Sequence, residues 1–163
     1  MRKAYLLSTI LIAALAGFGC SSSPDTTANS ACTSGLAWAG GNSGSEFMYP
    51  GRDCVGCHAS NGAPKLAIAG TVYTTFTDLD SCTGTAGAVV EITDANKVVT
   101  TFTSNQVGNF FARTSTAIAM PYTAKIKMNG KERVMATPQA TAACNSCHTA
   151  SGLNGAPGRI LAP

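Results

Sequence analysis

The chain has 163 residues, of which 45% are hydrophobic and 12% are charged, and its formal net charge is +3. A chain of this length and apolar content can bury one hydrophobic core, so we expect one compact domain. The basic residues form no clustered face of the kind that binds nucleic acid, which argues against that class of partner.

The N-terminus has the pattern of a lipoprotein signal peptide. Arg2 and Lys3 precede an apolar run that ends at Cys20, and this run is too short to span a membrane. Small residues before a cysteine match the cleavage pattern that leaves the cysteine as a lipid-modified N-terminus. We therefore expect residues 1–19 to be removed and Cys20 to carry lipid, with a plain secretory cut as the alternative because Phe18 fits the pattern poorly. Cleavage before Cys20 lowers the formal charge from +3 to +1.

Residues 20–34 are polar and rich in Ser and Thr, which predicts a flexible tether that lacks the apolar residues needed for ordering. Ser21, directly after the lipid site, resembles the signal of lipoproteins sent to the outer membrane. We therefore expect an exported outer-membrane lipoprotein on the periplasmic or the cell-surface face, attached to the membrane by its lipid.

Two C-x-x-C-H motifs contain four of the seven cysteines and both histidines of the chain. This spacing is the signature of c-type haem attachment, in which two thioethers hold the porphyrin and the next residue, His, binds the iron. We therefore expect two covalently bound haem c groups, in a first haem segment (35–65) and a second haem segment (138–163). The motif residues are Cys54, Cys57, His58, Cys144, Cys147 and His148.

Two alternatives exist for the C-x-x-C pairs, a four-thiolate zinc site and a thioredoxin-like redox pair. Zinc pairs usually lie about 15–20 residues apart, and neither alternative explains a histidine directly after each pair.

Cys32 and Cys82 then remain, and in an exported protein we expect them to form a disulfide, with two free thiols as the alternative.

Each motif is followed by the sequence Asn-Gly-Ala-Pro. In many small c-type cytochromes a proline carbonyl accepts the Nδ1 proton of the proximal histidine and fixes the orientation of the ring. Pro64 and Pro157 are the candidates for this role, and an ordinary Asn-Gly turn is the alternative.

The sixth ligand of each iron cannot be a histidine of this chain, because both histidines are proximal ligands. Methionine is the next common ligand, and Met48 lies close before the first motif. Met120, Met128 and Met135 are candidates for the second iron, and Met120 is the least constrained because it precedes Pro121 in a loop. The alternative for each methionine is simple packing in the core.

Residues 66–137 are rich in Thr and Val and predict six strands of a small antiparallel β-sandwich, flanked by the two haem segments. Asn129-Gly130 predicts a two-residue hairpin turn that pairs Lys127 with Glu132. A recurring pattern of small, aliphatic and turn residues runs through this segment, at Gly70, Gly87, Ala88, Val90, Asn105, Gly108 and Phe110. This pattern resembles the carboxypeptidase regulatory-like, transthyretin-type β-sandwich family, and the resemblance implies a mainly β fold and a non-catalytic module.

Three functions fit these motifs. The first is electron transfer between redox partner proteins or other cytochromes, without enzymatic catalysis; two haems in a short chain are typical of a relay. The second is small-ligand binding or peroxidase-like chemistry at an open iron, although no distal histidine exists for acid–base work. The third is a surface scaffold or adhesion module with accessory haems. Because six strands return the chain to the end where it started, we expect His58 and His148 at the same end of the sandwich.

Overall fold

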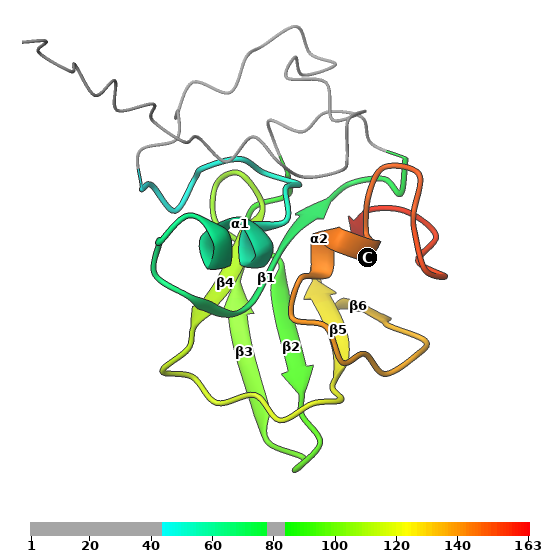
Figure 1. Ribbon diagram of the computed structural model, residues 1–163. Coiled ribbons are helices and arrows are strands. Elements are labelled where there is room, and N and C mark those ends of the chain that lie inside the picture. Colours follow the sequence, from blue (N-terminus) through cyan, green and yellow to red (C-terminus); the bar gives the residue numbers. More distant parts are fainter. Residues whose placement is uncertain (1–43, 78–83) are drawn as a thin grey trace, which may run out of the picture.

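The computed structural model describes residues 44–77 and 84–163, and the rest of the chain is the grey trace in Figure 1. The predicted signal peptide, the lipid site at Cys20, the tether and the Cys32–Cys82 disulfide all lie outside the described residues. In the part of the chain that is described, no helix is long and apolar enough to cross a membrane.

Six strands lie between the two C-x-x-C-H motifs, which confirms the sequence prediction. A short seventh strand, which the residue pattern does not predict, follows the second motif. The strands are β1 (Leu66–Tyr73), β2 (Val89–Thr93), β3 (Val99–Thr103), β4 (Asn109–Arg113), β5 (Thr123–Met128), β6 (Lys131–Val134) and β7 (Ile160–Leu161).

The strands form two sheets, and the mainly β fold class is confirmed. The three-stranded sheet has the order β4-β1-β7 and the four-stranded sheet has the order β3-β2-β5-β6. Only the β1–β7 pairing is parallel among these named strands.

Along β2, Val90 and Ile92 are buried while their neighbours are partly exposed, as expected for a sheet with one face in the core. The buried cluster contains Ile68, Val72, Ala88, Val90, Ile92, Phe110, Ala112, Tyr122, Ile126 and Cys144.

The β5–β6 hairpin has the predicted register. Asn129 and Gly130 have φ values of 50° and 73°, which a two-residue hairpin turn of this kind requires. Lys127 pairs with Glu132, as predicted, and the next pair is Met128 with Lys131. The inward face of this hairpin therefore supplies Ile126 to the core, with Ala124, Met128 and Met135 packed against it.

Both haem segments lie at the same end of the sandwich, as the even number of strands predicts (Figure 1). Helix α1 (Cys54–Ser60) and helix α2 (Cys144–Cys147) both pack against β1. The side-chain Nδ2 of Asn145 in α2 donates a hydrogen bond of 2.9 Å to the backbone oxygen of Arg52, just before α1. The two motifs are therefore neighbours in space although most of the sandwich separates them in sequence.

Candidate haem sites

The first motif lies on α1, which places its two cysteines and its histidine on adjacent turns. The Asp53 side chain caps this helix by accepting the backbone N–H of Gly56 at 2.8 Å. His58 Nδ1 lies 2.7 Å from the carbonyl oxygen of Pro64, which is the hydrogen bond that the sequence predicts. Nε2 is then the ring nitrogen that can bind iron.

The second motif repeats this arrangement with one correction. His148 Nδ1 lies 2.8 Å from the carbonyl oxygen of Gly158, so the predicted partner Pro157 is wrong by one residue. The backbone N–H of Arg159 donates to Phe76 O at 2.7 Å, which fixes the peptide between Gly158 and Arg159. Because the C=O and N–H of a trans peptide point in opposite directions, this bond turns the Gly158 carbonyl toward the imidazole.

The two Asn-Gly-Ala-Pro segments share a second contact. Asn61 Nδ2 lies 3.6 Å from the sulfur of Cys57, and Asn154 Nδ2 lies 3.7 Å from the sulfur of Cys147. Gly62 and Gly155 both adopt positive φ values, 68° and 87°, which glycine allows without strain. Each segment therefore places one amide beside the second cysteine of its own motif, and the carbonyl that meets the histidine is the last of the segment in the first motif and that of the next residue, Gly158, in the second.

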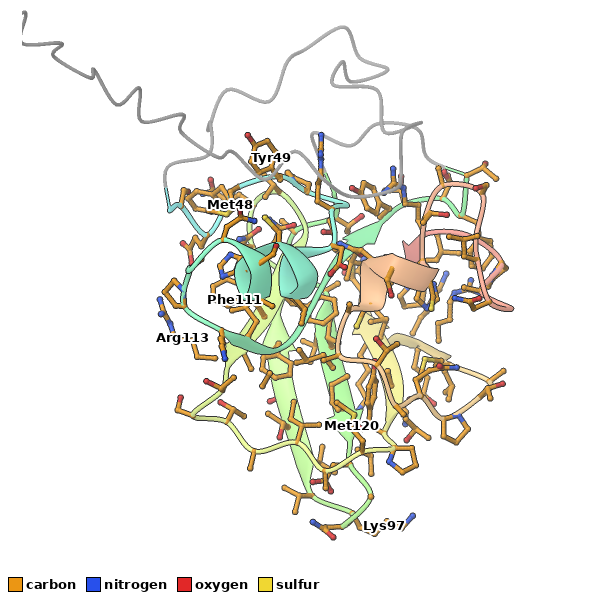
Figure 2. The ribbon with its side chains drawn as sticks, in the orientation of Figure 1. Met48, Tyr49, Lys97, Phe111, Arg113 and Met120 are labelled. Carbon is orange, nitrogen blue, oxygen red and sulfur yellow. The ribbon has the colours of Figure 1, made fainter. Side chains whose placement is uncertain are left out.

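A cavity of about 580 Å³ lies beside the first motif. Met48 and His58 both line it, so the structure brings the predicted sixth ligand and the predicted proximal ligand to one space. Figure 2 shows Met48 and Phe111 beside α1. The other lining residues include Cys54, Asn61, Pro64, Leu66, Asn109, Phe110 and Arg113, together with Glu46.

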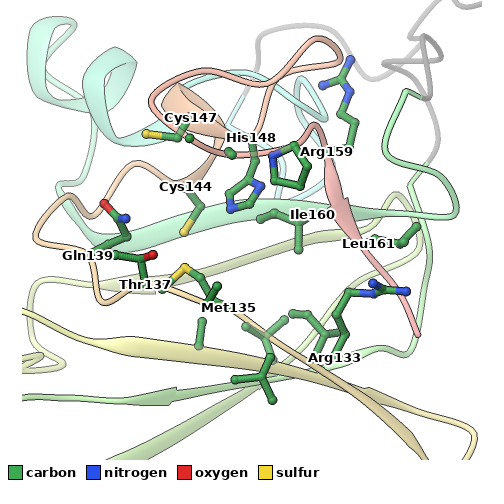
Figure 3. A pocket seen from close by; sticks show the side chains of 18 of the residues that line it. Arg133, Met135, Thr137, Gln139, Cys144, Cys147, His148, Arg159, Ile160 and Leu161 are labelled. Carbon is green, nitrogen blue, oxygen red and sulfur yellow. The ribbon is translucent and has the colours of Figure 1, made fainter.

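A second cavity of about 310 Å³ lies beside the second motif and reaches the core face of the four-stranded sheet. Its walls include Cys144, Cys147 and His148 from the motif and Val90, Ile92 and Ile126 from the core. Both volumes lie within or near the range of small-molecule and cofactor sites. Figure 3 shows the side chain of Met135 reaching into the second cavity beneath Cys144 and His148.

The structure does not support Met120 as the ligand of the second iron. Met120 is 36% exposed, lines neither cavity and lies far from α2 in Figure 2. Its loop precedes β5, whereas Met135 follows β6 and returns toward the second motif. Met135 is therefore the methionine that lies with His148, and Met128 packs in the core without lining this cavity.

Cationic side chains accompany both cavities. Arg113 lines the first cavity, and its role is not predicted from the sequence. Arg159 and Arg133 line the second, and Arg159 lies 4.6 Å from the centre of the Tyr73 ring. Arg52 lies 5.4 Å from the centre of the Tyr49 ring.

A glycine allows α2 to approach the sheet closely. A Cβ atom on Gly70 of β1 would lie 2.7 Å from the Phe110 ring and 3.0 Å from the Cβ atom of Cys144. The small residue at this position therefore lets the first cysteine of the second motif pack directly on β1.

Burial dominates the titration of the first cysteine in each motif. It raises the pKa of Cys144 to about 11, and it raises the pKa of Cys54 to about 11 with a further contribution from Asp53. Burial also raises the pKa of Tyr122 well above its ordinary value, so its phenol remains a donor, 3.0 Å from Thr141 O and 3.6 Å from Cys144 Sγ. With no metal bound, burial therefore favours the thiol form of both cysteines.

The described cysteines give no support to the zinc alternative. Cys54, Cys144 and Cys147 form no disulfide, whereas Cys57 is disulfide-bonded. No cluster of three or more metal-ligating side chains occurs within residues 44–77 and 84–163.

Comparison of the chain with protein-family models, curated proteins and solved structures finds no match. The resemblance to the transthyretin-type sandwich family therefore stays a prediction from the residue pattern. The geometry of the two motifs is what remains to support a functional assignment.

Proposed function

We propose that this chain is a dihaem c-type cytochrome that transfers electrons at the cell envelope. The observation that carries the proposal is the repeated geometry of the two C-x-x-C-H motifs. In each, the histidine Nδ1 is held by a backbone carbonyl at 2.7 or 2.8 Å, and the motif borders a cavity that also contains a methionine. This combination fits a covalently bound haem better than it fits zinc or a dithiol redox pair.

The residues of the chain have distinct roles in this proposal. Each cysteine thiol of a motif would add across one porphyrin vinyl group to form a thioether. The carbonyls of Pro64 and Gly158 keep the proton on Nδ1 and leave Nε2 of each histidine for the iron. Bound haem supplies a one-electron couple between ferric and ferrous iron.

Met48 and Met135 are the proposed sixth ligands. Each lines the cavity that its histidine lines, and a thioether raises the potential of a haem relative to a second imidazole. The proximity of α1 and α2 supports a relay within one molecule, because Asn145 in the second motif donates a hydrogen bond to the carbonyl oxygen of Arg52, two residues before the first motif.

A second candidate function has one observation in its favour. Glu46 and Arg113 line the first cavity together with Met48 and His58. If Met48 does not ligate the iron, this acid and this cation would face an open iron position, as small-ligand or peroxidase-like chemistry requires. Carbon monoxide binding to the reduced protein separates the two functions, because a six-coordinate relay excludes it.

We further propose that the mature chain is exported and anchored in the outer membrane through lipid on Cys20. This proposal rests on the N-terminal sequence alone. It places the two haems beside the membrane surface, where redox partner proteins or other cytochromes exchange electrons with them.

Expression in a host that attaches c-type haem tests the proposal directly. Mass spectrometry of the mature protein should show two added haems and a lipid on Cys20, and the visible spectrum should be low-spin. Metal analysis that found zinc and no haem iron would overturn the assignment. A low-spin spectrum that is unchanged by carbon monoxide would favour electron transfer over ligand binding.

A further inference from the structure

Three buried polar side chains form a hydrogen-bonded cluster between the two motifs. Thr71 of β1, Asn109 of β4 and Asn145 of α2 have exposed fractions of 0%, 5% and 4%. We refer to these three residues as the buried polar cluster. Neither the proposed attachment of haem nor its ligation by histidine and methionine explains why polar groups are buried here.

Asn145 uses all of its amide groups within this cluster. Its Oδ1 accepts the backbone N–H of Thr71 at 3.1 Å, and its Nδ2 donates to Thr71 Oγ1 at 3.1 Å and to Arg52 O at 2.9 Å. A residue between the two cysteines of the second motif therefore holds the backbone immediately before Cys54. The attachment chemistry itself requires no particular residue at this position.

The cluster continues from Thr71 to the segment that contains Met48. Thr71 Oγ1 accepts the backbone N–H of Gly51 at 2.9 Å and donates to Asn109 Oδ1 at 2.8 Å. Asn109 Nδ2 in turn donates to Met48 O at 3.0 Å and to Glu46 O at 3.3 Å. The hydroxyl of Thr71 thus makes one donor and two acceptor bonds, which is its full capacity.

We propose that Asn145 is a positioning residue that sets the axial ligation of the first haem from within the second motif. This inference rests on the proposed function. Through Arg52 the amide fixes the start of the first motif, and through Thr71 and Asn109 it fixes the backbone of Met48. Buried hydrogen bonds have few alternative geometries because every unsatisfied group in such a network is costly. The Met48 thioether is consequently held over the first haem by the residue that also anchors α2.

The test compares Asn145→Leu with Ser146→Ala in the haem-loaded protein. Leucine keeps the branched shape of Asn145 but removes its hydrogen bonds. The Ser146 hydroxyl donates to Ala143 O at 2.7 Å and lies 3.9 Å from Cys147 Sγ, both within its own turn. Imidazole titration of the ferric protein reports how firmly each methionine is bound. The Met48→Ala variant identifies which absorbance change belongs to the first haem.

We expect Asn145→Leu to weaken the hold on Met48 and so to increase the imidazole affinity of the first haem roughly tenfold, which corresponds to the loss of about one buried hydrogen bond. Ser146→Ala should leave the imidazole affinity of the first haem unchanged. Asn109→Leu, which breaks the cluster at the Met48 end without touching either motif, should act in the same direction and serves if Asn145→Leu does not fold.

The outcomes separate this inference from the proposed function. If the parent protein carries no haem, the proposed function fails. If the parent carries two low-spin haems but both leucine variants change only thermal stability, or only the second haem, the positioning role of Asn145 is overturned. A parallel increase for both variants at the first haem alone supports it.

Discussion

The two haem segments share one motif but differ in how they meet the sandwich. Helix α1 has no buried residue, and Pro64 and Asn61 behind it are exposed. Helix α2 buries Cys144 and Asn145, and its cavity reaches core residues such as Ile92 and Ile126. The same motif therefore occupies a peripheral position in α1 and a position continuous with the hydrophobic core in α2.

This difference assigns separate roles to the two haems of the proposed cytochrome. A haem beside α2 would contact the core of the sandwich and contribute to its stability by burying apolar porphyrin surface there. A haem beside α1 would lie at the periphery, where a redox partner can approach it. We expect the haem at the first site to exchange electrons with partner proteins. We expect the haem at the second site to connect the first site with the core of the sandwich.

Removal of each haem in turn provides the largest test of this comparison. Cys144→Ala with Cys147→Ala should lower the free energy of unfolding by on the order of 3–5 kcal/mol, the range seen when large groups are removed from a core. The matched change, Cys54→Ala with Cys57→Ala, should cost clearly less because α1 buries no residue. Chemical denaturation of both haem-loaded variants measures the difference. Equal losses would mean that the second haem is as peripheral as the first.

Axial ligation provides the next test. Met48→Ala should convert one of the two haems to a high-spin or water-ligated form and lower its potential, because the thioether is replaced by a weaker ligand. Met135→Ala should do the same to the other haem. Met120→Ala is the matched control, since its side chain is 36% exposed and lines neither cavity. Visible and electron paramagnetic resonance spectra that are identical for Met48→Ala and the parent would show that Met48 only packs.

The sequence predicts the sandwich well because its signals are local. Alternating β-branched residues define the six strands, and Asn129-Gly130 sets the register of Lys127 against Glu132. The position of both motifs at one end follows from counting strands. The bond from His58 to Pro64 is also local, because only a short turn separates the two residues.

The errors occur where a long-range contact decides the geometry. The partner of His148 is Gly158 rather than Pro157. The reason is that Phe76, which is far from His148 in the sequence, fixes the orientation of the peptide between Gly158 and Arg159. The sequence favours Met120 over Met135 because Met120 precedes a proline in a loop, but the path of the chain after β6 brings Met135 to the second cavity. The buried polar cluster likewise joins residues from three separate segments, and no spacing in the sequence indicates it.

A smaller effect is expected from Tyr122→Phe at the second site. The phenol donates to Thr141 O at 3.0 Å and lies 3.6 Å from Cys144 Sγ, so the change removes one donor from the partly buried carbonyl of Thr141. We expect a loss of about 1 kcal/mol in the free energy of unfolding. The potentials of both haems should remain unchanged, because the ring still fills the same volume. A large shift in the potential of the second haem would instead indicate that the hydroxyl acts on the porphyrin.

The smallest expected effect concerns the amides beside the cysteine sulfurs, the feature in which the two sites agree. Asn154→Gly keeps the left-handed backbone of this position, where φ is 51°, and removes the amide that lies 3.7 Å from Cys147 Sγ. A hydrogen bond to sulfur withdraws electron density from the attached porphyrin, so its loss should lower the potential of the second haem. Sulfur is a weak acceptor, and we therefore expect a shift below about 40 mV.

Asn129→Gly is the matched control for this variant, because Asn129 has the same backbone conformation, φ 50°, in the distant β5–β6 turn. Spectroelectrochemical titration of Asn129→Gly should detect no change in the potential of either haem. Asn61 makes the corresponding contact with Cys57 Sγ at 3.6 Å, so its removal should shift the first haem in the same direction. Shifts of opposite sign at the two haems would show that the sulfur contacts do not act alike. The repeated Asn-Gly-Ala-Pro segment would then be a shared turn whose amide has no common effect on potential.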